Sequence, residues 1–183
     1  MNPSRLHQLT ERLTSLFRAG LRQAATEHGL KLVQLEALIY LGSANRYSDT
    51  PAALTEYLGI TKGTVSQTLK ALEKRGLIKK VADLVDGRVV HCRPTETGQT
   101  MIDQVYPIQL FAELPDTTFE QPARELESLL RTLQQANDLR SFGICRSCRF
   151  FEPRELGGRC GLTKEALSPE DATKLCREHE LAS

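Results

Sequence analysis

The sequence contains no tryptophan, and aromatic residues make up only 5% of its 183 residues. So few aromatic side chains disfavour a ligand cavity lined with rings. Apolar runs are short and none approaches the roughly 18 residues that a membrane span needs, which excludes a transmembrane helix. The first thirty residues carry Glu11 and Glu27 among helix-forming residues, which argues against a secretory signal. We therefore expect a cytoplasmic protein without a membrane partner.

Charge is almost balanced over the whole chain but unevenly distributed along it. The formal net charge is +1, yet residues 61–93 hold eight basic and three acidic residues, so this segment is +5 and the remainder is −4. A basic block within an otherwise acidic chain is typical of a surface that contacts phosphate groups. Charge alone also fits a solvated face without a partner.

From Arg5 to Ala25, apolar residues recur at steps of three and four, the spacing of a helix with one buried face. This helix is longer than a small domain is wide, so we expect a second subunit to bury part of its apolar stripe. Thr50-Pro51 is a typical helix start, and Gly59 and Gly76 are typical helix ends. The pattern predicts helices over residues 5–25, 32–41, 51–58 and 61–75.

A helix, a short turn and a second helix form the basic unit of many DNA-reading proteins. The second of these helices buries Val65, Leu69 and Leu72. Its outward face carries Lys62, Thr64, Ser66, Gln67, Lys70 and Lys74. Two β-prone segments follow, residues 77–81 and 88–93, and the Asp86-Gly87 step between them is a strong turn signal. A hairpin directly after such a helix predicts a winged helix.

The stretch from Leu54 to Ile78 reads LTEYLGITKGTVSQTLKALEKRGLI and is followed by Asp86-Gly-Arg88 and by Thr95-Glu-Thr-Gly98. This ordered set resembles the MarR family of bacterial transcription factors, and the resemblance covers about residues 1–140. It implies a homodimeric winged helix-turn-helix regulator, favoured as a repressor, on a pseudo-palindromic operator in double-stranded DNA. The helix would enter the major groove and the wing tip the minor groove.

The resemblance implies a role for particular residues at each groove. Bases and phosphates would be contacted by Lys62, Thr64, Ser66, Gln67 and Lys70. Arg88 would enter the minor groove, oriented by a charge-assisted hydrogen bond to Asp86. The chemistry of the residues agrees, because Gln67 can pair bidentately with adenine and a minor-groove arginine reads groove width. The salt-sensitive phosphate contacts would come from Lys62, Lys70, Lys74 and Arg75. A small-molecule effector is left open.

The region after the hairpin departs from the family. We expect one helix from Thr95 and an amphipathic helix over about residues 121–139, where family members usually have one long helix. Prolines at positions 107, 115 and 122 break the region between the two. The details of dimer packing are therefore expected to differ from the family.

Four of the five cysteines lie in the C-terminal tail, beyond the resemblance. Cys145, Cys148, Cys160 and Cys176 follow the pattern C-x2-C-x11-C-x15-C. A segment of about 40 residues with few apolar side chains needs a staple to fold, and metal binding can supply it. We expect one metal centre on these four thiolates, with zinc and an iron–sulfur cluster equally favoured. A thiol redox switch is a less favoured alternative.

Two further expectations concern single residues of this region and of the wing. Ser168-Pro169 predicts a helix that places Cys176 and His179 one turn apart, and His179 in place of a cysteine would give a Cys3His zinc site. Cys92 follows His91 on the second wing strand, where alternation would point one inward and the other outward. A core role is favoured for Cys92, and a sensing role is left open.

The expectations combine into a mainly α fold, a winged helix-turn-helix of three helices and a two-stranded β-wing, with flanking dimerisation helices and a cysteine-rich tail. The parts are an N-terminal dimerisation helix (1–30), the DNA-binding domain (31–98), C-terminal dimerisation helices (99–140) and the metal-binding tail (141–183). We expect no enzyme, because no catalytic triad, phosphate-binding glycine loop or paired carboxylate motif occurs. The alternatives are a small iron–sulfur or thiol oxidoreductase that uses the winged helix as scaffold, and a protein-interaction module. In the favoured hypothesis the metal or redox state of the tail tunes DNA binding.

Overall fold

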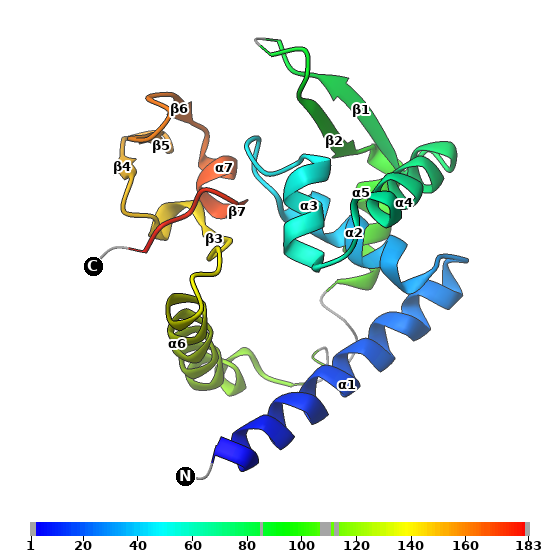
Figure 1. Ribbon diagram of the computed structural model, residues 1–183, viewed down its shortest axis with the longest axis vertical. Coiled ribbons are helices and arrows are strands. Elements are labelled where there is room, and N and C mark those ends of the chain that lie inside the picture. Colours follow the sequence, from blue (N-terminus) through cyan, green and yellow to red (C-terminus); the bar gives the residue numbers. More distant parts are fainter. Residues whose placement is uncertain (1–2, 85, 107–110, 112–113, 182–183) are drawn as a thin grey trace.

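The computed structural model describes residues 3–84, 86–106, 111 and 114–181. The chain begins with a long helix, continues as a compact winged-helix unit and ends in a tail of short elements (Figure 1). The larger elements are α1 (Pro3–Glu27), α2 (Leu32–Ser43), α3 (Pro51–Leu58), α4 (Lys62–Lys74), β1 (Ile78–Ala82), β2 (Val90–Pro94), α5 (Glu96–Val105) and α6 (Glu120–Ala136). The predicted mainly α winged helix is confirmed.

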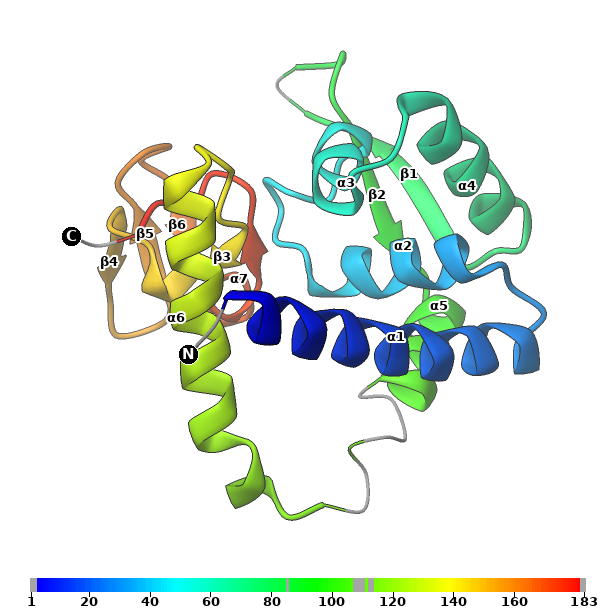
Figure 2. The ribbon, with the colours of Figure 1, turned by 60° about the horizontal axis from the view of Figure 1, so that its bottom comes forward.

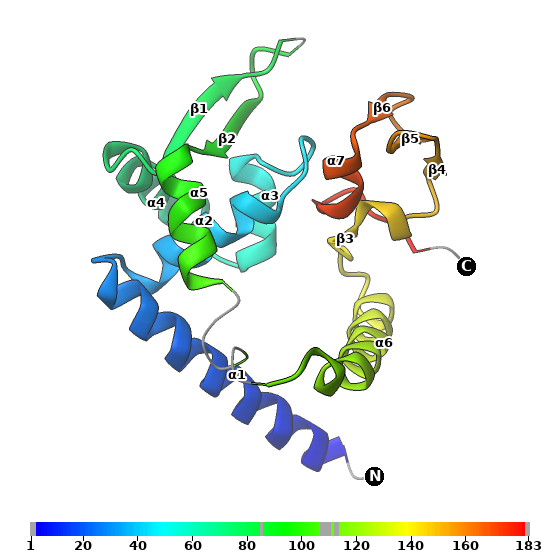
Figure 3. The same ribbon diagram turned by 180° about the vertical axis from the view of Figure 1, so that it is seen from behind.

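The core of the winged-helix unit lies between α2, α3 and α4. Apolar side chains of all three helices meet there and are completely or almost completely buried: Leu35, Leu38, Leu54, Leu69 and Leu72. The predicted inward face of α4 is confirmed, since Val65 is buried as well. This burial leaves the opposite face of α4 exposed, and the helix lies at the outer edge of the winged-helix unit in Figure 3.

The predicted helix boundaries in this unit follow from local chemistry. Thr50 accepts a hydrogen bond from the backbone of Ala53, and Pro51 occupies the first turn of α3. Gly59 ends α3 with a φ of +63°, which a side chain would disfavour. Thr61 caps α4 in the same way, with 3.2 Å from the Thr64 backbone nitrogen to its hydroxyl.

The wing is an antiparallel hairpin of β1 and β2, with pairs running from Ile78 opposite Pro94 to Ala82 opposite Val90. The predicted hairpin is confirmed, with strands displaced by one or two residues. Position 85, at the turn, lies outside the described residues.

The Thr-Glu-Thr-Gly sequence locks α5 against the start of the wing. Thr95 donates its hydroxyl proton to the carbonyl of Gly76 at 2.6 Å and caps α5 by accepting from the Gly98 nitrogen. A Cβ at Gly98 would lie 2.0 Å from the Leu77 carbonyl oxygen. Only glycine allows this close approach, which explains the glycine in the sequence pattern.

Helices α1 and α6 each carry a row of exposed leucines. In α1 the only buried residue is Ala25, and Leu9, Leu13 and Leu16 are exposed. Helix α6 has no buried residue, and Leu126, Leu130 and Leu133 are each about half exposed, at 49%, 53% and 51%. Figure 2 shows both helices on the outside of the molecule.

The interruption between α5 and α6 agrees with the prolines. Helix α5 ends at Val105, a short 3-10 turn spans Asp116–Thr118, and α6 starts at Glu120. Pro115 precedes the turn and Pro122 lies in the first turn of α6, whereas Pro107 falls outside the described residues. Within the described part of the chain, no helix is long and apolar enough to cross a membrane.

The tail is built from short strands and turns. Strand β3 (Gly143–Ile144) pairs with β7 (Leu175–Cys176), and β4 (Phe151–Pro153), β5 (Gly158–Cys160) and β6 (Ala166–Leu167) form a second small sheet. Helix α7 spans only Pro169–Thr173.

The prediction of one helix carrying Cys176 and His179 is wrong. Helix α7 starts as predicted, at Ser168-Pro169, but Lys174 adopts an extended conformation and ends it. Leu175 and Cys176 then pair with β3, and the Leu175 carbonyl accepts from the Asn45 backbone nitrogen at 2.9 Å. Pairing with a distant segment therefore overrides the local helical signal.

Candidate nucleic-acid interface

The outward face of α4 is a continuous polar surface. Six predicted contact residues are exposed on it: Lys62, Thr64, Ser66, Gln67, Lys70 and Lys74. The buried residues of the same helix are Val65, Thr68, Leu69 and Leu72, one helical face. The structure thus brings these six candidates together, and their contact with DNA stays a prediction.

The cations of the basic segment differ in how freely they can meet phosphate. Within the described part of the chain, Lys62, Lys70 and Lys74 make no ion pair. In contrast, Lys80 lies 2.6 Å from Glu73. The lysines of α4 are therefore cations that a polyanion can recruit without breaking an internal pair.

Arg75 has a structural role that the sequence did not reveal. Its guanidinium donates to the carbonyl oxygens of Gly29 at 2.5 Å and His28 at 2.9 Å. These bonds satisfy carbonyls at the end of α1, where helix termini leave acceptors unpaired. A phosphate contact by Arg75 stays a prediction, in competition with this bond to α1.

The wing tip presents a single arginine held by an aspartate. Arg88 is 91% exposed along its side chain, and its Nε and Nη2 donate to the two oxygens of Asp86 at 3.0 and 3.1 Å. The predicted hydrogen bond between Asp86 and Arg88 is confirmed. It lowers the pKa of Asp86 and raises that of Arg88, so both remain charged. The insertion of Arg88 into a groove stays a prediction.

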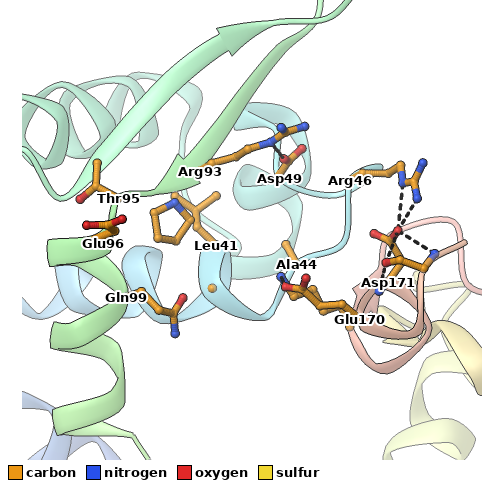
Figure 4. Close-up of a pocket in the computed structure, with 14 residues that line it drawn as sticks. Leu41, Ala44, Arg46, Asp49, Arg93, Thr95, Glu96, Gln99, Glu170 and Asp171 are labelled. Carbon is orange, nitrogen blue, oxygen red and sulfur yellow. Dashed lines mark hydrogen bonds and ion pairs between the residues drawn. The ribbon is translucent and has the colours of Figure 1, made fainter. Parts of the chain in front are cut away.

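The base of the wing is held by a buried charged cluster that the sequence reasoning missed. Asp49, between α2 and α3, accepts from His91 Nδ1 and, at 3.0 Å, from Arg93 Nε (Figure 4). His91 Nε2 lies 3.1 Å from Asp83 near the wing turn. The Asp49 carbonyl also accepts from the Cys92 nitrogen at 2.6 Å. These bonds fix the wing relative to the loop before α3.

The surroundings of His91 favour its protonated form. Burial by itself lowers its pKa, but hydrogen bonds to Asp49 and Asp83 outweigh burial and raise the pKa above its usual value. Both ring nitrogens face carboxylate oxygens, which accept, and only the protonated ring can donate from both nitrogens.

His91 and Cys92 lie on opposite faces of β2, but the prediction that one of them points outward is wrong. Both side chains are buried, because the core covers one face of β2 and the Asp49 cluster covers the other. Cys92 is the predicted core residue, and burial raises the pKa of its thiol to about 11. A protonated, buried thiol is a poor nucleophile, which counts against the sensing role.

The four tail cysteines line one small cavity, here called the cysteine cavity. Its volume is about 50 Å3, and Cys145, Cys148, Cys160 and Cys176 all contribute to its wall. Cys145 and Cys176 are buried, whereas the other two are half-buried. Burial, followed by the charges of the other three cysteines, raises the pKa of Cys145 to about 12. In the described segments, no three Cys, His, Asp or Glu side chains form a group arranged to hold a metal ion.

A buried amide lies near Cys176. Burial raises the pKa of Cys176, and the nearby Asn45 side chain acts in the opposite direction. Asn45 is only 1% exposed, and its Nδ2 atom has no hydrogen-bond partner within the described residues. The backbone nitrogen of Glu180 donates to the sulfur of Cys148 at 3.4 Å.

His179 does not face the cysteine cavity as a ligand. Its Nδ1 and Nε2 lie 2.7 and 3.0 Å from the hydroxyl oxygens of Ser141 and Ser147, so both ring nitrogens are engaged. The ring packs over Gly143, where a Cβ would approach it to 2.5 Å. The variant with three cysteines and His179 around zinc is therefore not supported by this geometry.

The tail is bound to residues 44–50, here called the α2–α3 loop. The Arg177 backbone nitrogen donates to the Ser48 hydroxyl at 2.7 Å, and Arg46 Nε donates to Asp171 at 3.1 Å (Figure 4). Arg177 also forms a bidentate pair with Glu56 on α3. A cleft of about 670 Å3 lies beside these contacts, between α5, the base of the wing and α7.

Comparisons with known proteins agree with this geometry. Residues 28–89 match the sequence profile of the MarR family. The chain is 30% identical over 113 residues to the transcriptional repressor MprA of Escherichia coli (strain K12). That match covers 58% of this chain and 64% of the repressor, so the chain spans just under two thirds of the length of this relative.

Two solved structures show the shared fold. One is a MarR transcriptional regulator from Methanosarcina mazei, with a TM-score of 0.58 and 19% identity over 73% of this chain and 99% of that chain. The other is Streptococcus pneumoniae FabT in complex with DNA, with a TM-score of 0.52 and 22% identity over 72% of this chain and 99% of that chain. The chain thus shares the winged-helix fold of these two proteins, and the profile match ends before the cysteine tail.

Proposed function

We propose that the chain is a homodimeric DNA-binding transcriptional regulator that acts as a repressor. The observation that carries this proposal is the joint surface of α4 and the wing tip. There, three lysines without internal ion pairs among the described residues lie on one helix face, and Arg88 extends from the neighbouring hairpin. The similarity to a transcriptional repressor and to a regulator solved in complex with DNA supports the same function.

The arrangement suits reading of both grooves. Helix α4 fits the major groove, where the amide of Gln67 can pair with the N6 and N7 atoms of adenine. Lys62, Lys70 and Lys74 would neutralise phosphates and make binding sensitive to salt. Arg88 would enter the minor groove beside the site and favour narrow, A·T-rich sequence there. Asp86 orients the guanidinium of Arg88 before DNA binds, which reduces the side-chain conformational entropy that is lost on binding.

The exposed leucines of α1 and α6 support the homodimer. Six leucines in two rows would be covered when a second copy packs α1 and α6 against the same helices. Burying a leucine side chain contributes roughly 1.5–3 kcal/mol, so rows of this length can hold two chains together. A two-fold dimer would present two copies of α4 about one helical turn of DNA apart, which implies a pseudo-palindromic operator.

A small-molecule effector has a place to bind in this scheme. The cleft of about 670 Å3 falls in the range of pockets that hold small molecules. It is bordered by Arg93 and Asp49, the residues that fix the base of the wing. A ligand in this cleft would therefore be able to move the wing. Effector binding would be lost from a variant in which a larger side chain fills the cleft.

Selection from a pool of randomised duplexes tests the proposed function. The full chain is expected to retain duplexes that share two inverted half-sites with centres about one helical turn apart. Failure to enrich any sequence at low ionic strength would contradict the proposal. If the same preparation then took electrons from an added donor and passed them to an acceptor, this result would favour the oxidoreductase alternative instead.

A further inference from the structure

We propose that the cysteine cavity holds an iron–sulfur cluster and that the bound cluster fixes the position of the wing through the α2–α3 loop. The first part rests only on the tail. The second part rests on the proposed function, because its consequence is a change in DNA affinity.

The shape of the cysteine cavity favours a cluster over a single zinc ion. Four thiolates around zinc lie about 2.3 Å from one centre, whereas no three Cys, His, Asp or Glu side chains of the described residues are grouped to hold a single ion. Here the four cysteines line a cavity of about 50 Å3 together with seven other residues. A polynuclear cluster places iron and sulfide between the thiolates, and four cysteines are the usual ligand set for it.

The surroundings of the cysteines suit a cluster as well. The cavity wall is completed mainly by apolar groups, among them Phe151, Leu162 and Leu167, and also includes Tyr47, Thr163 and Glu178. Such walls exclude water, which protects a cluster and tunes its potential. The wall therefore has the composition expected around a cluster.

Polar donors reach the sulfurs from outside this wall. The backbone nitrogen of Glu180 donates to Cys148, and the Asn45 side chain lies near Cys176, with no hydrogen-bond partner for its Nδ2 atom among the described residues. A buried amide without an acceptor costs free energy unless it meets one. A thiolate ligand of a cluster would supply that acceptor.

The tail lacks a core of its own without the cysteines. Its buried cluster consists of Cys145, Leu167 and Cys176, so two of three members are the proposed ligands. Metal binding to such a segment supplies free energy for its folding. An iron–sulfur cluster would therefore occupy the centre around which β3, β7 and the small sheet are arranged.

A short chain of contacts leads from Cys176 to the wing. Its neighbours on either side bind the α2–α3 loop, Leu175 through the Asn45 nitrogen and Arg177 through the Ser48 hydroxyl. The next residue of the loop is Asp49, which holds His91 and Arg93 at the base of the wing. Loss of the cluster would release the loop on its tail side and so loosen the anchor of the wing.

Analysis of the anaerobically purified full chain for iron, acid-labile sulfide and zinc tests the first part. The wild type is expected to be brown, with iron and sulfide in similar amounts. Cys160→Ala should lose both, whereas Cys92→Ala, a cysteine outside the cavity, should keep both. A colourless wild type with zinc, or one without metal, would overturn the proposal, as would full iron content in Cys160→Ala. Circular dichroism checks that the helices persist in each variant.

Titration of a selected duplex with loaded and chelator-stripped wild type tests the second part. The stripped protein should bind more weakly, within the roughly 5- to 150-fold range usual for coupled sites. Equal affinity of the two forms would overturn the coupling. If the loaded chain contained iron and sulfide but neither form bound any duplex, the proposed function would fail while the cluster site would be supported.

Discussion

The guanidinium of Arg177 donates hydrogen bonds to both carboxylate oxygens of Glu56, with 2.8 Å from Nε to Oε2 and 2.6 Å from Nη2 to Oε1. Arg177 directly follows Cys176, and Glu56 lies on α3, the first helix of the helix-turn-helix. The hydrogen bonds from Arg177 lower the pKa of Glu56, so the pair stays charged. This contact joins the cysteine tail to the DNA-reading unit.

Substitution Glu56→Gln should loosen the tail. A half-exposed bidentate ion pair contributes about 0.5–1 kcal/mol to the free energy of unfolding. The uncharged amide of glutamine keeps only part of this contribution. We expect a small decrease in the free energy of unfolding and faster proteolytic cleavage within residues 141–181. Limited proteolysis followed by mass spectrometry measures this. Glu155→Gln, an exposed tail carboxylate, is the matched control, and equal cleavage of the two variants would argue against the link.

Substitution Lys70→Ala should weaken DNA binding through its electrostatic part. Loss of one phosphate contact lowers the slope of log affinity against log salt concentration by about 1, and does so for specific and non-specific duplexes alike. Titrations at several salt concentrations give the slope. Arg124→Ala removes one positive charge from α6, away from the proposed surface, and should leave the slope unchanged. Equal slopes for wild type and Lys70→Ala would exclude this lysine from the interface.

The wing anchor should weaken as pH rises. The pKa of His91 is raised in the folded protein, so its contribution is complete below the unfolded value of about 6.5 and is lost as pH rises through the folded value. Urea unfolding of wild type and His91→Gln across this range measures it. The difference in unfolding free energy between them should be larger at pH 5.5 than at pH 8.5. A difference independent of pH would show that His91 is not charged against Asp49 and Asp83.

Substitution Leu130→Glu should dissociate the dimer. A charge in the middle of the α6 leucine row would be buried against the second copy without a partner, which costs several kcal/mol. Sedimentation velocity should show a monomer, and duplex binding should weaken because only one α4 remains per particle. Ser128→Glu places the same charge on the opposite face of α6 and should remain dimeric. A dimeric Leu130→Glu would place the interface elsewhere.

Local signals in the sequence were sufficient to predict the winged-helix unit. Thr50-Pro51, Gly59 and Gly76 mark helix ends through capping and backbone chemistry that depend on a few neighbouring residues. The polar face of α4 follows from the helical spacing of its apolar residues. The wing follows from the turn signal between its two strands. The Asp86–Arg88 bond joins residues two apart. Such features need no knowledge of the rest of the chain.

Contacts between distant segments could not be predicted in this way. Asp49 and His91 are 42 residues apart, and no local pattern indicates that a loop carboxylate covers the second face of β2. The helix predicted through Cys176 failed because pairing with β3 and with Asn45 competes with it. The clustering of the four cysteines was predicted from their spacing, but the cavity between them required the fold.

Fluorescence anisotropy with a selected duplex tests the central claim, that α4 and the wing tip together grip DNA. Wild type should bind saturably with two chains per duplex, and affinity should fall steeply with salt. Arg88→Ala should weaken binding by roughly tenfold, with the largest loss on duplexes with A·T-rich flanks. If Arg88→Ala combined with Lys70→Ala bound that duplex as tightly as the wild type, the proposed interface would be contradicted.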